Sequence, residues 1–185
     1  MLTWLRALFN SLVFPLWTAL SVTAGLCAGL VTRDPFLFYR WQRGWARGLF
    51  KLCGIEVEVQ GAEHMSPDGA YVIVANHASY MDIPALFATL PKLPQFMAKK
   101  ELSRIPFLGA ALRAGRHVLV SRGNAGNART SLDTAAEHLK AGAAILMFPE
   151  GTRSTKDTIA RFKTGAFRFA KLGDIAIRPV GISGT

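Results

Sequence analysis

Residues 71–82 read Tyr71-Val-Ile-Val-Ala75 and then Asn76-His-Ala-Ser-Tyr-Met-Asp82. The first five are a continuous apolar run, which is typical of a strand buried on both faces of a sheet. The polar residues that follow are then expected in a loop at the end of that strand. In sheets covered by helices, such loops carry the functional groups. This stretch therefore predicts an α/β fold with a site just beyond the strand.

The rest of the chain repeats this alternation of short apolar runs and longer mixed segments. Strands are predicted at 55–59, 71–75, 96–98, 118–120, 143–148 and 175–182, and helices at 83–90, 106–114, 127–140 and 163–172. Strands that alternate with helices imply an α/β domain whose sheet is mixed, mostly parallel and covered by helices.

The composition combines high hydrophobicity with a strong positive charge. Half of the 185 residues are hydrophobic, yet 22 Lys and Arg stand against 12 Asp and Glu, a formal charge of +10. The hydrophobicity excludes an intrinsically disordered chain. Cys27 and Cys53 are too few for a disulfide framework or a zinc site. A compact basic protein of this kind is expected to meet an anionic partner: a nucleic acid, a phosphorylated substrate or an acidic lipid surface.

The hydrophobicity is concentrated at the N-terminus. Between Arg6 and Arg33 lie 26 residues without a charge, and about 20 apolar helical residues suffice to cross a bilayer. Pro15 can divide this stretch into two shorter helices. The flank at 33–51 mixes Arg and Lys with aromatic residues, which suits the headgroup region and places the rest of the chain in the cytoplasm. A spanning helix, a half-inserted hairpin and a buried soluble helix remain alternatives.

Two segments follow from this pattern. Residues 1–50 are predicted to be a membrane-anchoring helical segment with a basic and aromatic flank, and residues 51–185 to be the α/β domain.

His77 and Asp82 are candidates for acid–base chemistry. In a loop that leads into a helix, side chains five residues apart can meet. Asp82 can then accept a hydrogen bond from one imidazole nitrogen and leave the other nitrogen free to take a proton. Asp82 also suits the N-cap of the following helix, and it can serve in both roles.

A second polar loop, Pro149-Glu-Gly-Thr-Arg-Ser154, follows the predicted strand 143–148. Its glycine lets backbone amides approach a ligand, and its Thr, Arg and Ser are donors suited to phosphate. A tight turn with a solvated Arg is the alternative. Further cations near predicted strand ends suggest a shared anion pocket: Lys99, Lys100, Arg122, Arg161 and Lys163.

The chain has no nucleophile elbow, P-loop, dinucleotide motif or metal-ligand spacing. A His–Asp pair beside a phosphate-binding loop then favours direct attack by an activated hydroxyl, with no covalent intermediate and no metal.

Together these motifs resemble those of the glycerolipid acyltransferases, specifically the bacterial 1-acylglycerol-3-phosphate (lysophosphatidate) acyltransferases. The matching segments are Asn-His-x4-Asp at 76–82, Lys100-Glu-Leu102 before Ile105-Pro-Phe-Leu-Gly109, Phe148 to Ser154, Phe162-Lys-Thr-Gly-Ala166 and Ile177-Arg-Pro-Val-Gly-Ile-Ser183. The resemblance extends from about the N-terminal anchor to the last residue.

The resemblance implies acyl transfer from acyl-CoA or acyl carrier protein to the 2-hydroxyl of lysophosphatidate. The product is phosphatidate, and the active site is expected on the cytoplasmic face of a bacterial inner membrane. The thioester is a co-substrate, so no cofactor and no metal is expected, and neither is a nucleic-acid partner. His77 and Asp82 are implied to be catalytic. Substrate binding is implied for Asn76, Ser79, Lys100, Arg122, Glu150, Gly151, Thr152, Arg153 and Lys163.

The chain departs from the family pattern in two places. The second motif usually has Gly six residues before its Arg, but Arg116 stands there and Gly115 is displaced by one. Family members also continue for some tens of residues beyond the last motif, so we expect that the domain lacks its C-terminal end. Two alternative functions stay open: acylation of another lysolipid such as a lyso-ornithine lipid, and non-catalytic binding of anionic lipid.

Overall fold

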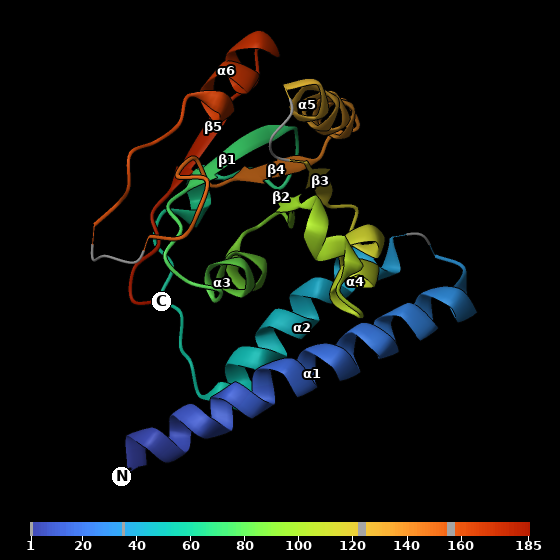
Figure 1. Cartoon of the computed structure of the whole chain (residues 1–185), viewed down its shortest axis with the longest axis vertical. Helices are drawn as coiled ribbons and strands as arrows, with labels where there is room; N and C mark the ends of the chain where they lie inside the picture. Colours follow the sequence, from blue (N-terminus) through green and yellow to red (C-terminus); the bar gives the residue numbers. More distant parts are fainter. Residues whose placement is uncertain (1, 35, 122–124, 155–157) are drawn as a thin grey trace.

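Five parallel strands form one sheet in the order β3-β2-β4-β1-β5 (Figure 1). The computed structural model describes residues 2–34, 36–121, 125–154 and 158–185. The strands are β1 (Tyr71–Ala75), β2 (Pro94–Lys99), β3 (Val118–Val120), β4 (Ala144–Met147) and β5 (Ile177–Val180). The helices are α1 (Leu2–Thr32), α2 (Leu37–Cys53), α3 (Asp82–Thr89), α4 (Leu108–Ala114), α5 (Ala125–Lys140) and α6 (Gly165–Leu172), with short 3-10 helices η1 (Ala62–His64) and η2 (Lys100–Arg104).

Every described strand pairing is parallel, so the predicted α/β fold is confirmed. In the centre, Tyr71 pairs with Ala144 on one side and Val72 with Ile177 on the other. Because the strands are parallel, their carboxyl ends lie along one edge of the sheet. The loops that follow β1, β4 and β5 are therefore neighbours.

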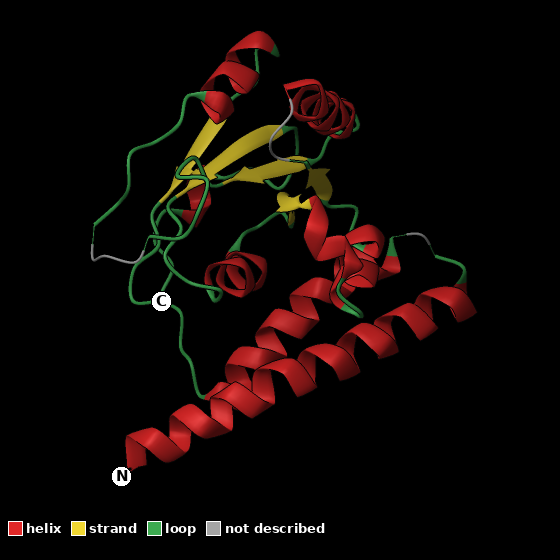
Figure 2. Ribbon diagram, in the orientation of Figure 1, coloured by secondary structure: helices red, strands yellow, loops and turns green. Residues whose placement is uncertain are grey.

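Helices cover both faces of the sheet (Figure 2). Val72 and Val74 of β1 pack with α5 and α6 on one face. Tyr71 and Ile73 point the other way and pack with Leu86 and Leu90 at α3. All five residues of β1 are buried, as the continuous apolar run predicted.

The two N-terminal helices add further layers below α3. Leu49 and Phe50 of α2 pack against Ala85 of α3, and α1 lies along α2 (Figure 1). Indole groups join the two N-terminal helices, because Trp41 donates to Ser21 Oγ at 3.0 Å and Trp45 to Thr18 Oγ1 at 3.1 Å.

The basic and aromatic flank also binds the body of the protein. Arg43 donates to the carbonyl of Pro91 and Arg47 to that of Ala88, just beyond or at the end of α3. Cations suit these sites because the last carbonyls of a helix carry partial negative charge. These two side chains, which are expected at lipid headgroups, therefore also help to hold α2 on α3.

Helix α1 runs without interruption through Pro15, so the possible division into two helices is not observed. Within it, Leu8–Thr32 is long and apolar enough to cross a membrane by length and composition. One side of α1 packs on α2, while large apolar side chains of the other side are exposed: Leu8, Phe9, Leu12, Leu16, Leu20, Leu30 and Val31. Leu8, Leu12, Leu16 and Leu20 recur every four residues and form an apolar stripe along the first part of the helix, and Leu30 and Val31 are exposed near its end.

The predicted strand at 55–59 is wrong. These residues have no regular secondary structure and form no sheet ladder within the described chain, and Val57 and Val59 are 40% and 46% exposed. Alternation of apolar and charged residues predicts which side chains share a face, but a strand also needs a neighbouring backbone to bond.

Candidate active site

The candidate site lies at the carboxyl edge of the sheet, where β1 and its neighbours β4 and β5 end. His77 follows β1 directly, Glu150 follows β4, and the segment 181–185 follows β5. Since β1 pairs with both β4 and β5, their three loops meet around His77. This agrees with the general position of ligand sites in parallel sheets.

His77 and Asp82 form a close pair. The distance from His77 Nδ1 to Asp82 Oδ2 is 2.6 Å, and the Asp82 side chain is fully buried while that of His77 is 17% exposed. Asp82 Oδ2 also accepts the N–H groups of Ala78 and Ser79 at 2.8 and 2.9 Å. The side chains predicted to meet in this loop do meet.

Burial by itself raises the pKa of Asp82, but hydrogen bonds reverse the shift. Donors from His77, the Ser79 amide, the Thr185 hydroxyl and the Ala78 amide together bring the pKa below its ordinary value. Asp82 is therefore a carboxylate at neutral pH, so Nδ1 of His77 carries the proton that joins the pair. No group of the described chain bonds Nε2, which is left as a proton acceptor.

The loop between the two residues is shaped by Asp82 and Ser79. Ser79 Oγ accepts the N–H of Met81 at 3.1 Å, and the Asp82 N–H donates to the Ser79 carbonyl at 3.4 Å. Asp82 is the first residue of α3, and the N-cap is Met81, which makes no side-chain cap hydrogen bond, so the N-cap role predicted for Asp82 is wrong. The Asp82 carboxylate closes the turn and orients His77 at once. On its other side, the His77 ring stacks on Phe148, with centroids 3.9 Å apart and planes 15° apart.

Glu150 is buried and bonded to the backbone on both sides. One carboxylate oxygen accepts the His77 N–H at 2.6 Å, and the other accepts the Ala160 N–H at 2.9 Å. The His77 carbonyl in turn accepts the N–H of Ser154 at 2.8 Å. Glu150 thereby joins the loop after β1 to the loop after β4.

The segment after β5 is bonded to the same loop. The side-chain amide of Asn76 donates to the Ile182 carbonyl at 2.8 Å and accepts the Ile182 N–H at 2.7 Å. The Thr185 hydroxyl donates to Asp82 Oδ1 at 2.7 Å. A cavity of about 840 Å³ borders the other side of this segment, between residues 55–65 and α3. Sequence analysis missed Thr185, because 103 residues separate it from Asp82.

Two cations lie at the glycine loop. Gly151 has φ +76, and a Cβ there would lie 2.7 Å from Lys163 Nζ, so a glycine permits both the backbone turn and the close ammonium. The Lys163 N–H donates to the Pro149 carbonyl at 2.9 Å. The guanidinium of Arg153 lies over the Tyr80 ring, 3.6 Å from its centroid.

The other predicted substrate-binding residues are placed less closely. Thr152 is exposed in the same loop, and Lys100 is exposed at the start of η2, beyond the end of β2. Among the described residues, no hydrogen bond or ion pair joins Lys100 to His77. Arg122 lies outside the described residues. Within the described ranges, no group of three or more His, Cys, Asp or Glu side chains is arranged to hold a metal ion.

The structure also accounts for the departure at Arg116. This residue has φ +59, in the left-handed region where glycine is favoured. Its guanidinium lies 4.9 Å from the Phe36 ring centroid, a contact that offsets part of the backbone strain.

Comparison with known proteins agrees with the predicted resemblance. The family model described as "Acyltransferase" matches residues 56–183. The chain is 34% identical over 133 residues to 1-acyl-sn-glycerol-3-phosphate acyltransferase alpha of Homo sapiens, covering 71% of this chain and 47% of that protein. It is 36% identical over 137 residues to the 1-acyl-sn-glycerol-3-phosphate acyltransferase of Saccharomyces cerevisiae, covering 72% and 45%. The chain therefore spans about half the length of these curated relatives.

A solved structure is similar over nearly the whole chain. It is the crystal structure of the 1-acyl-sn-glycerophosphate (LPA) acyltransferase PlsC from Thermotoga maritima. The TM-score is 0.79 at 26% identity, and the match covers 94% of this chain and 70% of that one.

Proposed function

The chain belongs to the acyltransferase family, and from that premise we propose that it transfers a fatty acyl group from a thioester to the 2-hydroxyl of lysophosphatidate. The product is phosphatidate. The observation that carries this proposal is the His77–Asp82 pair, whose geometry suits deprotonation of a hydroxyl. The names of the relatives support lysophosphatidate as the acceptor.

His77 is the general base in this mechanism. Its Nε2 takes the proton of the 2-hydroxyl as the oxygen attacks the thioester carbonyl. The C–S bond then breaks, and the leaving thiolate receives the proton from His77. Asp82 holds the tautomer with Nδ1 protonated and stabilises the imidazolium that forms between these steps. General-base catalysis of this kind contributes about 10²- to 10⁴-fold.

Lys163 and Arg153 are the proposed ligands of the acceptor phosphate. Both flank the glycine loop, and both are cations whose donors suit phosphate oxygens. Stacking on Tyr80 orients the guanidinium before the substrate arrives, which lowers the entropy cost of binding. Lys100, Thr152 and Arg122 keep their proposed role in substrate binding.

Asn76 and Glu150 are better suited to positioning than to substrate binding. The Asn76 side-chain amide is hydrogen-bonded to the backbone of Ile182, and both carboxylate oxygens of Glu150 accept hydrogen bonds from backbone amides. Ser79 likewise bonds Met81 and Asp82 within its own loop. These residues hold the backbone from which His77 projects.

The N-terminal helices are the proposed membrane attachment, on the cytoplasmic face of a bacterial inner membrane. One side of α1 is held by α2, which itself packs on α3. Lipid therefore has access to one side of α1, where the apolar stripe lies. This arrangement favours a half-inserted helical pair over a spanning helix.

Thiol release tests the activity. Purified protein in vesicles is given lysophosphatidate, a lyso-ornithine lipid or a phosphate-free monoacylglycerol, each with acyl-CoA or acyl carrier protein as donor. We expect acceptor-dependent release with lysophosphatidate, and the donor panel decides between the two thioesters. Binding of anionic lipid without thiol release from any pair would support the non-catalytic alternative.

Arg153→Ala tests the phosphate contact in the same assay. It should raise the KM for lysophosphatidate and leave turnover of the phosphate-free acceptor unchanged. Equal losses with both acceptors would contradict a phosphate contact.

A further inference from the structure

The turn between η2 and α4 exposes large apolar side chains. Ile105 is 47% exposed and Phe107 is 53% exposed, and Pro106 between them is also exposed. Three consecutive exposed apolar residues at the tip of a turn are unusual on a surface that meets only water.

This exposure does not come from a loose loop. The Leu108 N–H donates to the Pro106 carbonyl at 2.6 Å, and the Gly109 N–H donates to the Ile105 carbonyl at 2.8 Å. A Cβ on Gly109 would lie 2.0 Å from the Ser103 carbonyl oxygen, so the two arms of the turn are in backbone contact. The turn is tightly built and holds its tip outward.

Phe107 occupies a backbone conformation that disfavours a side chain. Its φ is +60 and its ψ is −51, outside the regions that residues with a Cβ ordinarily adopt. Glycine would form this turn with less strain, yet the chain has a large aromatic ring there. Strained residues of this kind concentrate at functional positions.

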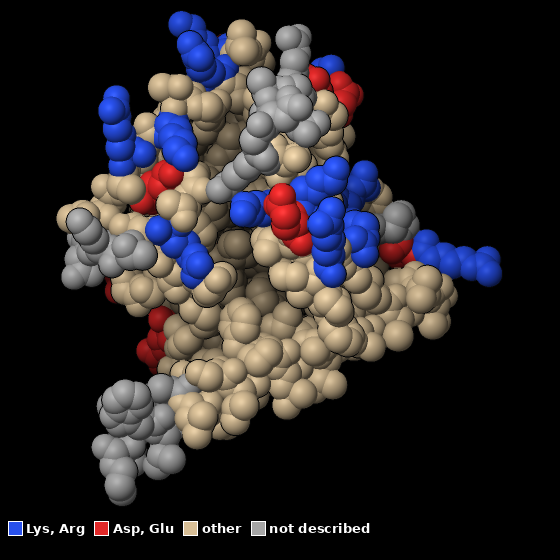
Figure 3. All heavy atoms as spheres, in the orientation of Figure 1, with Lys and Arg blue, Asp and Glu red and all other residues tan. Residues whose placement is uncertain are grey.

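Cations flank the apolar tip. Residues 99–116 contain five Lys and Arg but a single acidic residue, Glu101. Lys100 and Arg104 of η2 and Arg113 of α4 are all exposed. Figure 3 shows Lys and Arg gathered over η2 and α4, whereas most of the surface over α1 lacks them. An apolar tip beside a cationic collar matches an anionic lipid surface, with rings among the acyl chains and cations at the headgroups.

We propose that Ile105-Pro-Phe107 is a second membrane contact, which inserts between anionic lipids so that its apolar side chains reach the acyl chains. Helix α4 contacts both α1 and α2, and the turn points toward α1 (Figure 2). The inference rests on the membrane attachment proposed above for α1. Two separate contacts fix the tilt of the domain on the bilayer, which one helix does not, and thereby set the height of the strand-end site above the lipid.

A fluorophore that reports on polarity tests the contact directly. Cys27→Ser is the background, since Cys27 is exposed and Cys53 is buried. NBD is attached to Phe107→Cys or, as the matched control, to Leu172→Cys. Leu172 is 90% exposed on α6, on the opposite side of the sheet from α1 (Figure 1). Vesicles of phosphatidylcholine with phosphatidylglycerol, some carrying doxyl-labelled lipid, are then added.

We expect a blue shift and doxyl quenching at position 107 but not at 172, with a smaller effect when phosphatidylglycerol is left out or salt is added. If protein that sediments with vesicles keeps the label at 107 in water, the inference is overturned. A blue shift caused by acyl carrier protein without vesicles would also overturn it, because the turn would then be a protein-docking site. This measurement needs no turnover, so it is independent of the proposed activity.

Phe107→Gly supplies a functional test with Leu172→Ser as control. Glycine relieves the backbone, so thermal stability should be maintained or increased. We expect about tenfold lower turnover of lysophosphatidate in vesicles and unchanged turnover of a short-chain, dispersed acceptor. Equal losses on both acceptors, or no loss on either, would contradict a membrane contact.

Discussion

His77 and His117 have similar partners but opposite surroundings. Each ring lies 3.9 Å from a phenylalanine ring, and each bonds a side-chain oxygen, Asp82 at 2.6 Å and Gln42 at 2.7 Å. His117 also accepts the Phe96 N–H through Nδ1 at 3.2 Å, so both of its nitrogens are bonded. His77 has one nitrogen bonded, and its ring reaches solvent.

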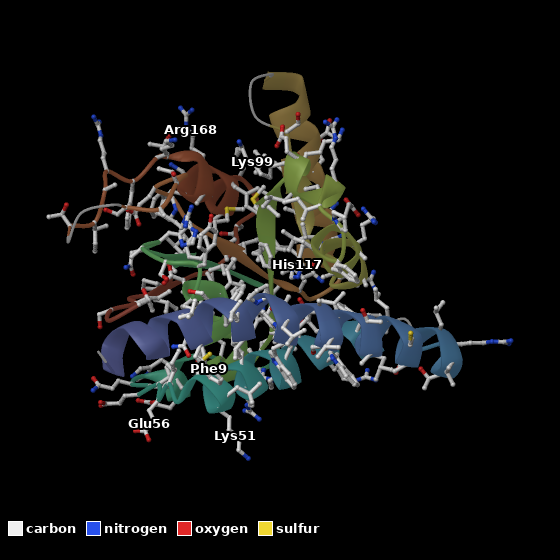
Figure 4. All side chains as sticks on the ribbon, turned by 60° about the horizontal axis from the view of Figure 1, so that its bottom comes forward. Phe9, Lys51, Glu56, Lys99, His117 and Arg168 are labelled. Carbon is white, nitrogen blue, oxygen red and sulfur yellow. The ribbon has the colours of Figure 1, made fainter. Side chains whose placement is uncertain are left out.

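The difference shows what makes a histidine available for chemistry. Burial lowers the pKa of His117 to about 3, so this ring stays neutral between α2 and the sheet (Figure 4). An amide partner gives His117 no means to stabilise a positive charge. A carboxylate partner and an unbonded nitrogen give His77 both a place for a proton and a counter-ion.

Exchanging each ring for a methyl group should separate the two roles most strongly. We expect His77→Ala to lower turnover by about 10³-fold, because the base is lost, and to lower the unfolding free energy by about 1 to 2 kcal/mol, because the buried Asp82 carboxylate loses a donor. His117→Ala should cost about 3 kcal/mol of stability, because it leaves a cavity and two unpaired groups, while turnover per folded molecule is kept. Thiol release and denaturant unfolding measure the two effects. If His77→Ala kept turnover close to that of the wild type, His77 would not be the general base.

The pH dependence of stability is the next largest difference. His117 is neutral in the folded protein down to about pH 3, but its ordinary pKa is 6.5 in the unfolded chain. Between about pH 7 and pH 5 the unfolded chain therefore gains a proton that the folded chain does not, which lowers the unfolding free energy by about 2 kcal/mol. The stabilisation is complete above the unfolded pKa and is lost as the pH falls below it.

Unfolding curves of the wild type and His117→Gln over this pH range measure the contribution. The variant should lose less stability on acidification, because Gln does not titrate. Parallel pH profiles would mean that His117 is protonated in the folded protein.

The sequence predicted these sites unequally, for physical reasons. The run Tyr71–Ala75 was assigned correctly because burial on both faces leaves an unbroken apolar signal. The contact between His77 and Asp82 was also predictable, because two side chains five residues apart in a turn are brought together by the local backbone alone. The possible division of the N-terminal helix at Pro15 is not observed, because packing on α2 outweighs the local tendency of proline to break a helix.

Contacts between distant segments could not be predicted in this way. Glu150 lies 73 residues from His77, and its motif suggested a substrate ligand, whereas the structure directs both oxygens to backbone amides. Such pairings depend on strand order, which places β4 beside β1. Arg116 was recognised as a departure, but its positive φ is a property of the fold.

Glu150→Gln should sharpen the comparison by weakening one of the two backbone contacts of this side chain, to His77 or to Ala160. The amide nitrogen of Gln would face an N–H donor, so one charge-assisted hydrogen bond is lost. We expect kcat to fall about tenfold while the KM for the acceptor is unchanged, equally with and without a phosphate on the acceptor. Glu137→Gln, which removes an exposed pair with Lys140, is the control. If only the KM for the acceptor increased, the result would support a substrate-binding role for Glu150.

The smallest expected effect comes from Thr185→Val, which takes one donor from Asp82 and keeps the shape of the side chain. Because burial raises the pKa of Asp82 and hydrogen bonds lower it, removing a bond should raise that pKa. Asp82 is then protonated at higher pH, so the acid limb of the kcat/KM profile should move to higher pH, while activity at neutral pH, where Asp82 stays ionised, should fall by about threefold at most. Thr185→Ser should restore the profile, and Thr134→Val, which removes a hydroxyl that bonds its own helix, should leave it unchanged. If activity fell equally at every pH and the acid limb did not move, Thr185 would support the loop by packing and would not affect the pKa of Asp82. The ionised partner that distinguishes His77 from His117 would then depend on the other donors to Asp82.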